Sequence, residues 1–148
     1  DTNAVLAITA DEIMRRRTTT GSDSLRVFDS STGATHAFTK AIITTQYDLI
    51  YSASVDIDSR NSNVQYLDVT DTSAYSINNP SNGSPGQELV LIIRNGSGGT
   101  MGVITWGSLY RFEGTTDPTV PTNNKYLKLT FHLIGSLWIG SKAENIWT

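Results

Sequence analysis

The chain contains no cysteine, and its only two histidines are His36 and His132. The absence of cysteine excludes a disulfide framework, a thiolate metal site and a thiol nucleophile. The histidines are far apart in the sequence, and His132 falls on the polar face of an expected strand. We therefore interpret His132 as a surface or interface residue in preference to a catalytic base.

Long hydrophobic runs are also missing. No window approaches the ~18 apolar residues that are needed to cross a bilayer, and no signal-peptide pattern opens the chain, so we expect no membrane insertion. The net charge of -3 provides no general attraction to nucleic acid, and we expect no such partner. Because the first residue is Asp1 and not methionine, we expect a processed chain or a piece of a longer protein.

Recognisable chemical motifs are absent as well. The sequence has no HExxH zinc motif, no Walker A loop, no GxSxG elbow and no GxGxxG fingerprint. Asp56, Asp58, Asn61 and Asn63 resemble a calcium loop in composition, but Arg60 stands where that loop needs an oxygen ligand. We expect no metal and no cofactor.

Glu113 and Asp117 are a pair of carboxylates that could be compared with those of a glycosidase. Such a pair needs one carboxyl group with a raised pKa and a defined separation between the two groups. Nothing in the surrounding sequence provides either property. We therefore predict no catalytic residue and no enzymatic activity.

Threonine, serine, asparagine and glycine make up much of the remainder, which is typical of β-rich, loop-rich proteins. The longest apolar run lies in the segment Gln87–Gly140. Within it, Leu89–Ile93 predicts a central strand buried on both faces, and Asn95–Gly99 predicts a hairpin turn. Tyr126–Leu133 alternates between polar and apolar residues, and its apolar face consists of Leu127, Leu129, Phe131 and Leu133.

The whole chain predicts an all-β fold, an antiparallel, jelly-roll-like β-sandwich, because short β-branched segments alternate with turn signals. A final hairpin turns at Ile134–Leu137. The expected strands are Leu25–Asp29, Ala34–Phe38, Ala41–Thr45, Asp48–Val55, Val64–Thr70, Ala74–Ile77, Leu89–Ile93, Met101–Trp106, Leu109–Glu113, Tyr126–Leu133 and Trp138–Gly140.

Residues 1–24 differ in composition from the rest and predict an N-terminal arm. Thr9 and Glu12 form a capping box for a short helix, Ala10–Arg17. The basic triplet at the end of this helix has three interpretations: a solvated helix end, a docking arm for an acidic partner, or a nucleic-acid contact. We expect an arm over residues 1–24, a small β segment over 25–63 that packs on the core, and a core domain over 64–148.

Three aromatic residues suggest binding. Trp106 and Tyr110 lie near glycine-rich turns, where exposed rings could stack on a sugar; the alternative is an ordinary place in the core. Trp147 is the second residue from the end of the sequence, a position that is seldom buried within its own domain. A neighbouring subunit is therefore a plausible site for its burial.

The second half of the chain resembles a β-domain that recurs in virion proteins of tailed bacteriophages. The resemblance covers roughly residues 64–142 and departs from the usual last turn at the apolar Ile134–Leu137. It rests on Gly86-Gln87, Asn95–Gly99, Ile104–Gly107 with Tyr110 and Phe112, and Leu129–Phe131 with Gly135 and Trp138.

This resemblance implies a non-enzymatic fibre or decoration module of a phage particle, assembled as a homotrimer. It would serve attachment or assembly of the shell and its appendages, on either the head or the tail. The arm would then anchor to other virion proteins through Ile13, Arg15, Arg16 and Arg17. The expected subunit interface comprises Tyr126, His132, Leu137 and Trp147. The alternative is a carbohydrate-binding module in which Trp106 and Tyr110 bind a host surface glycan.

Overall fold

The computed structural model describes residues 44–114, 116–141 and 144–146. The chain divides into a unit of residues 1–40 and a unit of residues 41–148, and the described residues all belong to the second unit. The predicted helix Ala10–Arg17, the strands predicted before residue 44, the anchor residues Ile13, Arg15, Arg16 and Arg17, and Trp147 lie outside the described residues.

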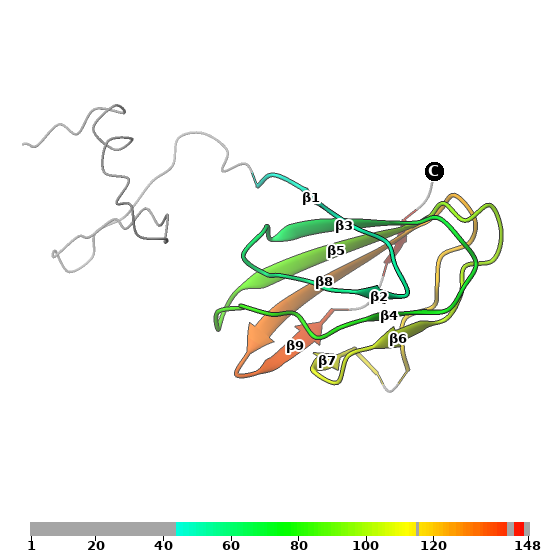
Figure 1. Cartoon of the computed structure of the whole chain (residues 1–148). Coiled ribbons are helices and arrows are strands. Elements are labelled where there is room, and N and C mark those ends of the chain that lie inside the picture. The colour runs from blue at the N-terminus through cyan, green and yellow to red at the C-terminus, as the bar shows by residue number, and fades with distance from the viewer. Residues whose placement is uncertain (1–43, 115, 142–143, 147–148) are drawn as a thin grey trace, which may run out of the picture. The chain divides into compact units, whose positions relative to one another are not determined.

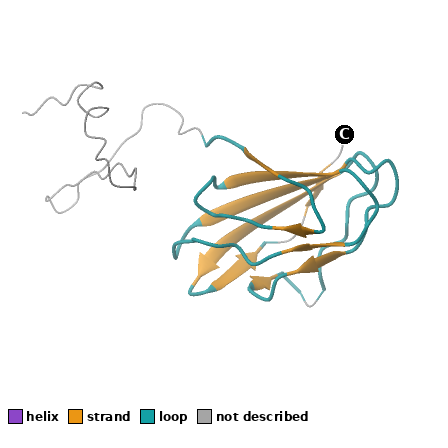
Figure 2. Ribbon diagram, viewed as in Figure 1, coloured by secondary structure: helices purple, strands orange, loops and turns teal. Residues whose placement is uncertain are grey.

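The described residues form strands and loops and contain no helix (Figure 2). The prediction of an all-β fold is therefore confirmed. The strands are β1 (Tyr47–Leu49), β2 (Ser54–Val55), β3 (Val64–Val69), β4 (Tyr75–Ile77), β5 (Glu88–Asn95), β6 (Ile104–Trp106), β7 (Tyr110–Arg111), β8 (Tyr126–Ile134), β9 (Leu137–Gly140) and β10 (Glu144–Ile146).

The first six strands form a short β-solenoid. The chain passes back and forth between two sheets, so that β1, β3 and β5 pair in parallel in one sheet. In the same way β2, β4 and β6 pair in parallel in the other sheet (Figure 1). Each pair of successive strands is thus one coil, which stacks on the coil before it. The predicted antiparallel sandwich is wrong because successive strands lie in opposite sheets and pair with the next coil, not with each other.

An antiparallel end follows the solenoid. Strand β8 pairs antiparallel with β5, and β9 and β10 both pair antiparallel with β8. The larger sheet therefore has seven strands, in the order β1-β3-β5-β8-β9-β7 with β10 also on β8. The predicted final hairpin is confirmed, and Gly135 in its turn has a φ of 62°, a left-handed value that glycine adopts without steric cost.

The core lies between the two sheets and is almost entirely aliphatic and aromatic. In β8, Leu127, Leu129, Phe131 and Leu133 are buried, so the predicted alternation is confirmed. In β5, Leu89, Leu91 and Ile93 are fully buried, whereas the residues between them are half-buried. The prediction that this strand is buried on both faces is therefore wrong, because the second sheet covers only one face of it.

Glycines are required where the corners of successive coils meet. A Cβ added to Gly102 would lie 2.1 Å from the carbonyl oxygen of Ser73 in the preceding coil. A Cβ on Gly107 would lie 2.6 Å from the backbone nitrogen of Asn79. The turn Asn95–Gly99 is likewise a corner and not the predicted hairpin, since β5 and β6 lie in different sheets.

Candidate functional site

One face of the seven-stranded sheet points away from the three-stranded sheet, and we call it the outer face. Its residues alternate along each strand with those of the core, and the strand register aligns them in rows across the sheet. The rows are Val64, Val90 and Thr130; Asp48, Tyr66, Ile92 and Lys128; Asp68, Arg94 and Tyr126; Glu88, His132 and Ile139; and Ile134 with Leu137. The backbone register of β10 continues two of these rows, with Glu144 opposite Lys128 and Ile146 opposite Tyr126.

Two acidic side chains on the outer face each lie beside a basic side chain of the neighbouring strand. Arg94 Nη1 lies 2.9 Å from a carboxylate oxygen of Asp68, and the charge of Asp68 raises the pKa of the guanidinium. His132 Nε2 lies 3.7 Å from a carboxylate oxygen of Glu88. Both pairs link neighbouring strands and are partly exposed, so each adds little to stability by itself.

Three of the residues expected at a subunit interface lie on this one face. Tyr126 and Leu137 are half-buried, and His132 is exposed. Ile134, which belongs to the apolar turn noted in the sequence, and Ile139, which sequence reasoning missed, also lie on this face, with exposed fractions of 64% and 37%. Their alternation with the buried Leu133 and Trp138 was the available signal, because it assigns them to the opposite side of the sheet.

The two residues considered for glycan binding do not form a platform. Tyr110 is only 4% exposed, its hydroxyl donates a hydrogen bond of 3.1 Å to the carbonyl oxygen of Asn78, and burial raises the pKa of its phenol. Trp106 is half-buried and meets Tyr110 edge-on, at an interplanar angle of 72°. Both rings belong to an aromatic cluster with Phe112 and Phe131 at one end of the core. A sugar-stacking surface needs exposed, roughly coplanar rings, and this pair does not provide one.

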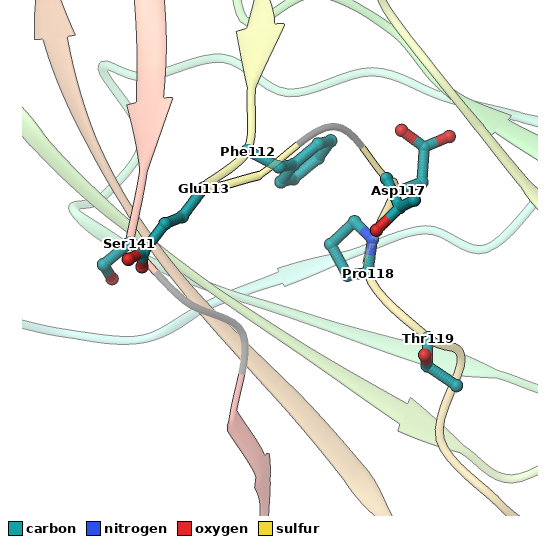
Figure 3. A pocket seen from close by; sticks show the side chains of 7 residues that line it. Phe112, Glu113, Asp117, Pro118, Thr119 and Ser141 are labelled. Atoms are coloured by element: carbon teal, nitrogen blue, oxygen red, sulfur yellow. The ribbon is translucent and has the colours of Figure 1, made fainter.

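The acidic residues that were considered as ligands or catalysts are scattered. Asp58 forms an ion pair of 2.7 Å with Arg60, which holds the pKa of its carboxyl group well below the usual range. Glu113 and Asp117 line a surface pocket, in which the Glu113 side chain lies beside Ser141 and the Asp117 carboxylate points away from Ser141 (Figure 3). No group of three potential metal ligands occurs in the described part of the chain.

No helix among the described residues is long and apolar enough to cross a membrane. Comparisons of the chain with protein-family models, with curated proteins and with solved structures found no match. The outer face is therefore the feature of the described residues from which a function can be argued.

Proposed function

We propose that this chain is a non-enzymatic structural protein of a tailed-bacteriophage particle. In this proposal it forms a fibre or decoration module that projects from the particle and serves attachment or assembly of the shell and its appendages. It acts as a homotrimer. The observation that carries the proposal is the outer face, a broad, partly apolar sheet surface that brings together three residues expected at a subunit interface, Tyr126, His132 and Leu137.

The β-solenoid suits this role mechanically. Its coils are held together by continuous backbone ladders from β1 to β5 in one sheet and from β2 to β6 in the other. The described residues also contain no cluster of metal-binding side chains, and the carboxylates of Glu113 and Asp117 do not converge (Figure 3). These features favour a scaffold over a catalyst.

The proposal is tested by measuring whether the chain is part of the phage particle. Phage particles from a culture that produces the chain are banded by density, and the fractions are probed with an antibody raised against the purified chain. We expect the chain to band with intact particles, and electron microscopy with the same antibody to mark the shell or the tail. Recovery of the chain only in particle-free fractions would contradict the proposal.

A further inference from the structure

We propose that Asn82 is a site of spontaneous chemical modification, at which the side-chain amide deamidates through a succinimide formed with the backbone nitrogen of Gly83. The sequence has two asparagines that are followed by glycine, Asn82 and Asn95. Glycine has no Cβ to shield its backbone nitrogen, so this nitrogen reaches the preceding side chain more easily than that of any other residue. The fold leaves the reaction open at Asn82 and blocks it at Asn95. The inference does not depend on the proposed function.

The reaction is a substitution at the side-chain carbonyl carbon of Asn82, and its only co-reactant is water. The backbone nitrogen of Gly83 loses its proton and bonds to Cγ of Asn82. The Cγ–Nδ2 bond breaks, and the NH₂ group leaves with that proton as ammonia. Water then opens the succinimide ring on either side of its nitrogen, which gives aspartate or isoaspartate. The new carboxyl group passes its proton to ammonia, so one amide and one water become one carboxylate and one ammonium ion.

At Asn95 the fold holds both reacting groups. The backbone nitrogen of Gly96 donates a hydrogen bond of 2.9 Å to the carbonyl oxygen of Val69 in the preceding coil. The side chain of Asn95 is fully buried, and its amide nitrogen and its oxygen are both hydrogen-bonded. Attack on this side chain therefore requires the corner after β5 to unfold locally. Openings of a packed core approach the free energy of global unfolding.

At Asn82 neither group is held in this way. The Asn82 side chain is exposed, and its amide nitrogen donates to the adjacent hydroxyl of Ser81 at 3.3 Å. The backbone hydrogen bonds of the described residues include none from the nitrogen of Gly83. Asn82 also has a φ of 58°, a left-handed value that is unfavourable for a residue with a Cβ. Rotation of the Asn82–Gly83 peptide towards the side chain thus breaks no backbone hydrogen bond in the described part of the chain.

The residues on either side keep the loop in place while this peptide rotates. Before it, the backbone nitrogen of Ser81 donates to the carbonyl oxygen of Ile57 at 2.9 Å, and the carbonyl oxygen of Ser81 accepts from Ser59 at 3.0 Å. After it, the backbone nitrogen of Gly86 donates to the carbonyl oxygen of Leu133 at 2.8 Å. Asn82 and Gly83 therefore form a short stretch between two anchored points, and the reaction proceeds without unfolding of either sheet.

The isoaspartate product disturbs a packed contact. A Cβ added to Gly83 would lie 2.6 Å from Cζ2 of Trp138 and 2.7 Å from Cδ2 of Leu133, so the main chain of Gly83 lies close against both side chains. Trp138 is buried. Isoaspartate routes the main chain through Cβ and lengthens it by one atom directly before Gly83. We expect Gly83 to shift, which loosens the packing of Trp138 in the β8–β9 hairpin.

Both products also place a negative charge near Asp58. Hydrogen bonds from Arg60 hold the pKa of the Asp58 carboxyl group below its usual range, and the side chain of Asn82 adds to this effect. A carboxylate at residue 82 replaces a hydrogen-bond donor with a like charge, which opposes the ionised form of Asp58. Aspartate and isoaspartate share this charge, whereas only isoaspartate lengthens the main chain.

Ageing of the full-length chain followed by peptide mapping tests the proposal. A folded sample and a sample unfolded in guanidinium chloride are incubated side by side at neutral pH and digested with trypsin in heavy-oxygen water, which marks any deamidation during digestion. Trypsin separates the two asparagines into residues 61–94 and 95–111, and fragment masses locate the modified residue. In the folded chain we expect Asn82 to convert at least ~10-fold faster than Asn95, because only Asn95 requires opening of the core. In the unfolded chain we expect comparable rates.

A second measurement follows the consequence for the fold. Aged wild type is expected to contain isoaspartate, detected by enzymatic methylation, and to have a lower urea midpoint than fresh wild type. Asn82→Ser cannot form the succinimide and is the matched control, which should keep its midpoint through the same incubation. Fresh Asn82→Asp carries the charge without the longer main chain, so its midpoint should lie between those of fresh wild type and the isoaspartate form.

Equal conversion of Asn82 and Asn95 in the folded chain would overturn the inference, because the fold would then not select between them. An unmodified Asn82 in the folded chain, together with conversion of both asparagines in the unfolded chain, would overturn it too. An equal loss of midpoint in aged wild type and aged Asn82→Ser would contradict the consequence for the fold and assign the ageing to another residue.

Discussion

The side-chain amide of Asn95 donates a hydrogen bond of 3.0 Å to the backbone carbonyl oxygen of Pro121. Asn95 is fully buried at the end of β5. Its amide also donates to the carbonyl of Gly99 at 3.1 Å, and its side-chain oxygen accepts bonds from the backbone N–H and the hydroxyl of Ser97. One side chain thus connects the corner after β5 to the loop before β8.

The first prediction concerns this asparagine. Asn95→Ala removes four hydrogen bonds and leaves the buried carbonyl of Pro121 and the partly buried N–H of Ser97 without their partner, whereas the carbonyl of Gly99 keeps a bond of 3.3 Å from the Ser97 hydroxyl. Each such buried group costs about 1–3 kcal/mol, and we expect a total loss of about 2–4 kcal/mol in the free energy of unfolding. Urea denaturation measures it. Asn61→Ala, at an exposed turn position, is the control and should change stability by less than ~0.5 kcal/mol; equal effects of the two would contradict the account.

The second prediction concerns the stacking of coils. Gly102→Ala places a methyl group against the backbone of Ser73, with the nearest atom 2.1 Å from the new Cβ, so one corner must move. We expect a loss of at least ~2 kcal/mol, within the range of overpacking. Gly99→Ala is the matched control, because its Cβ would meet only the Thr72 methyl group at 3.5 Å. Equal melting temperatures of the two variants would show that Gly102 does not lie in close contact with the backbone of Ser73.

The sequence predicted the features that depend on neighbouring residues, and it did not predict those that depend on pairing between distant segments. The alternation in Tyr126–Leu133 is local, and it correctly predicted a strand with one buried face. Parallel pairing is not local. Tyr47 pairs with Gln65, and Gln65 with Leu91, so successive coils differ in length and produce no fixed repeat that a search for periodicity would find. Strands of two or three residues such as β2 and β4 are also too short to show a period.

The candidate site was predictable to a similar extent. Tyr126 and His132 were assigned correctly to the side of β8 opposite the core, because that assignment follows from the alternation within one strand. The rows that join Asp48 to Lys128 depend on the register between four strands, which no single segment encodes. Trp106 and Tyr110 were considered as exposed rings, but the cluster that they form with Phe131 exists only once β6, β7 and β8 meet.

The third prediction is a loss of stability at alkaline pH. Burial raises the pKa values of Tyr75 and Tyr110 in the folded state, whereas in the unfolded chain both phenols titrate near pH ~10. Above that pH the unfolded state releases protons that the folded state keeps, so the free energy of unfolding falls by up to ~1.4 kcal/mol per pH unit for each tyrosine. Below pH ~10 neither tyrosine makes the free energy of unfolding depend on pH.

Urea midpoints between pH ~8.5 and ~11.5, a range that brackets the ordinary phenol pKa, test this prediction. The Y75F/Y110F double variant should have a shallower alkaline slope than wild type, with the remainder coming from Tyr51 and Tyr66, whose pKa values are also raised; the exposed Tyr47→Phe should retain the wild-type slope. An unchanged slope in the double variant would assign the alkaline transition to other groups. Tyr110→Phe also removes the 3.1 Å hydrogen bond to the carbonyl of Asn78. We therefore expect this substitution to lower the free energy of unfolding at neutral pH by ~1 kcal/mol.

The last prediction concerns Gln65, which is fully buried in β3. Its side-chain nitrogen donates hydrogen bonds to the carbonyl oxygens of Asp58 at 2.8 Å and Ser62 at 3.1 Å, and so holds the turn between β2 and β3. Gln65→Glu keeps the shape but replaces the amide donor with a carboxyl group. Such a group donates only while it is protonated, and burial disfavours its charged form.

We therefore expect the carboxyl group of the Gln65→Glu variant to have a raised pKa in the folded state. The unfolded chain ionises near pH ~4.3, so the variant should lose stability relative to wild type as the pH rises above that value. Gln65→Met removes the donors without adding a titrating group, and its cost of ~1–3 kcal/mol should not depend on pH. Urea midpoints of both variants from pH ~4 to ~8, on either side of the glutamate pKa, separate the two effects. Parallel profiles would mean that the glutamate reaches water and that the Asp58–Ser62 turn does not depend on this donor.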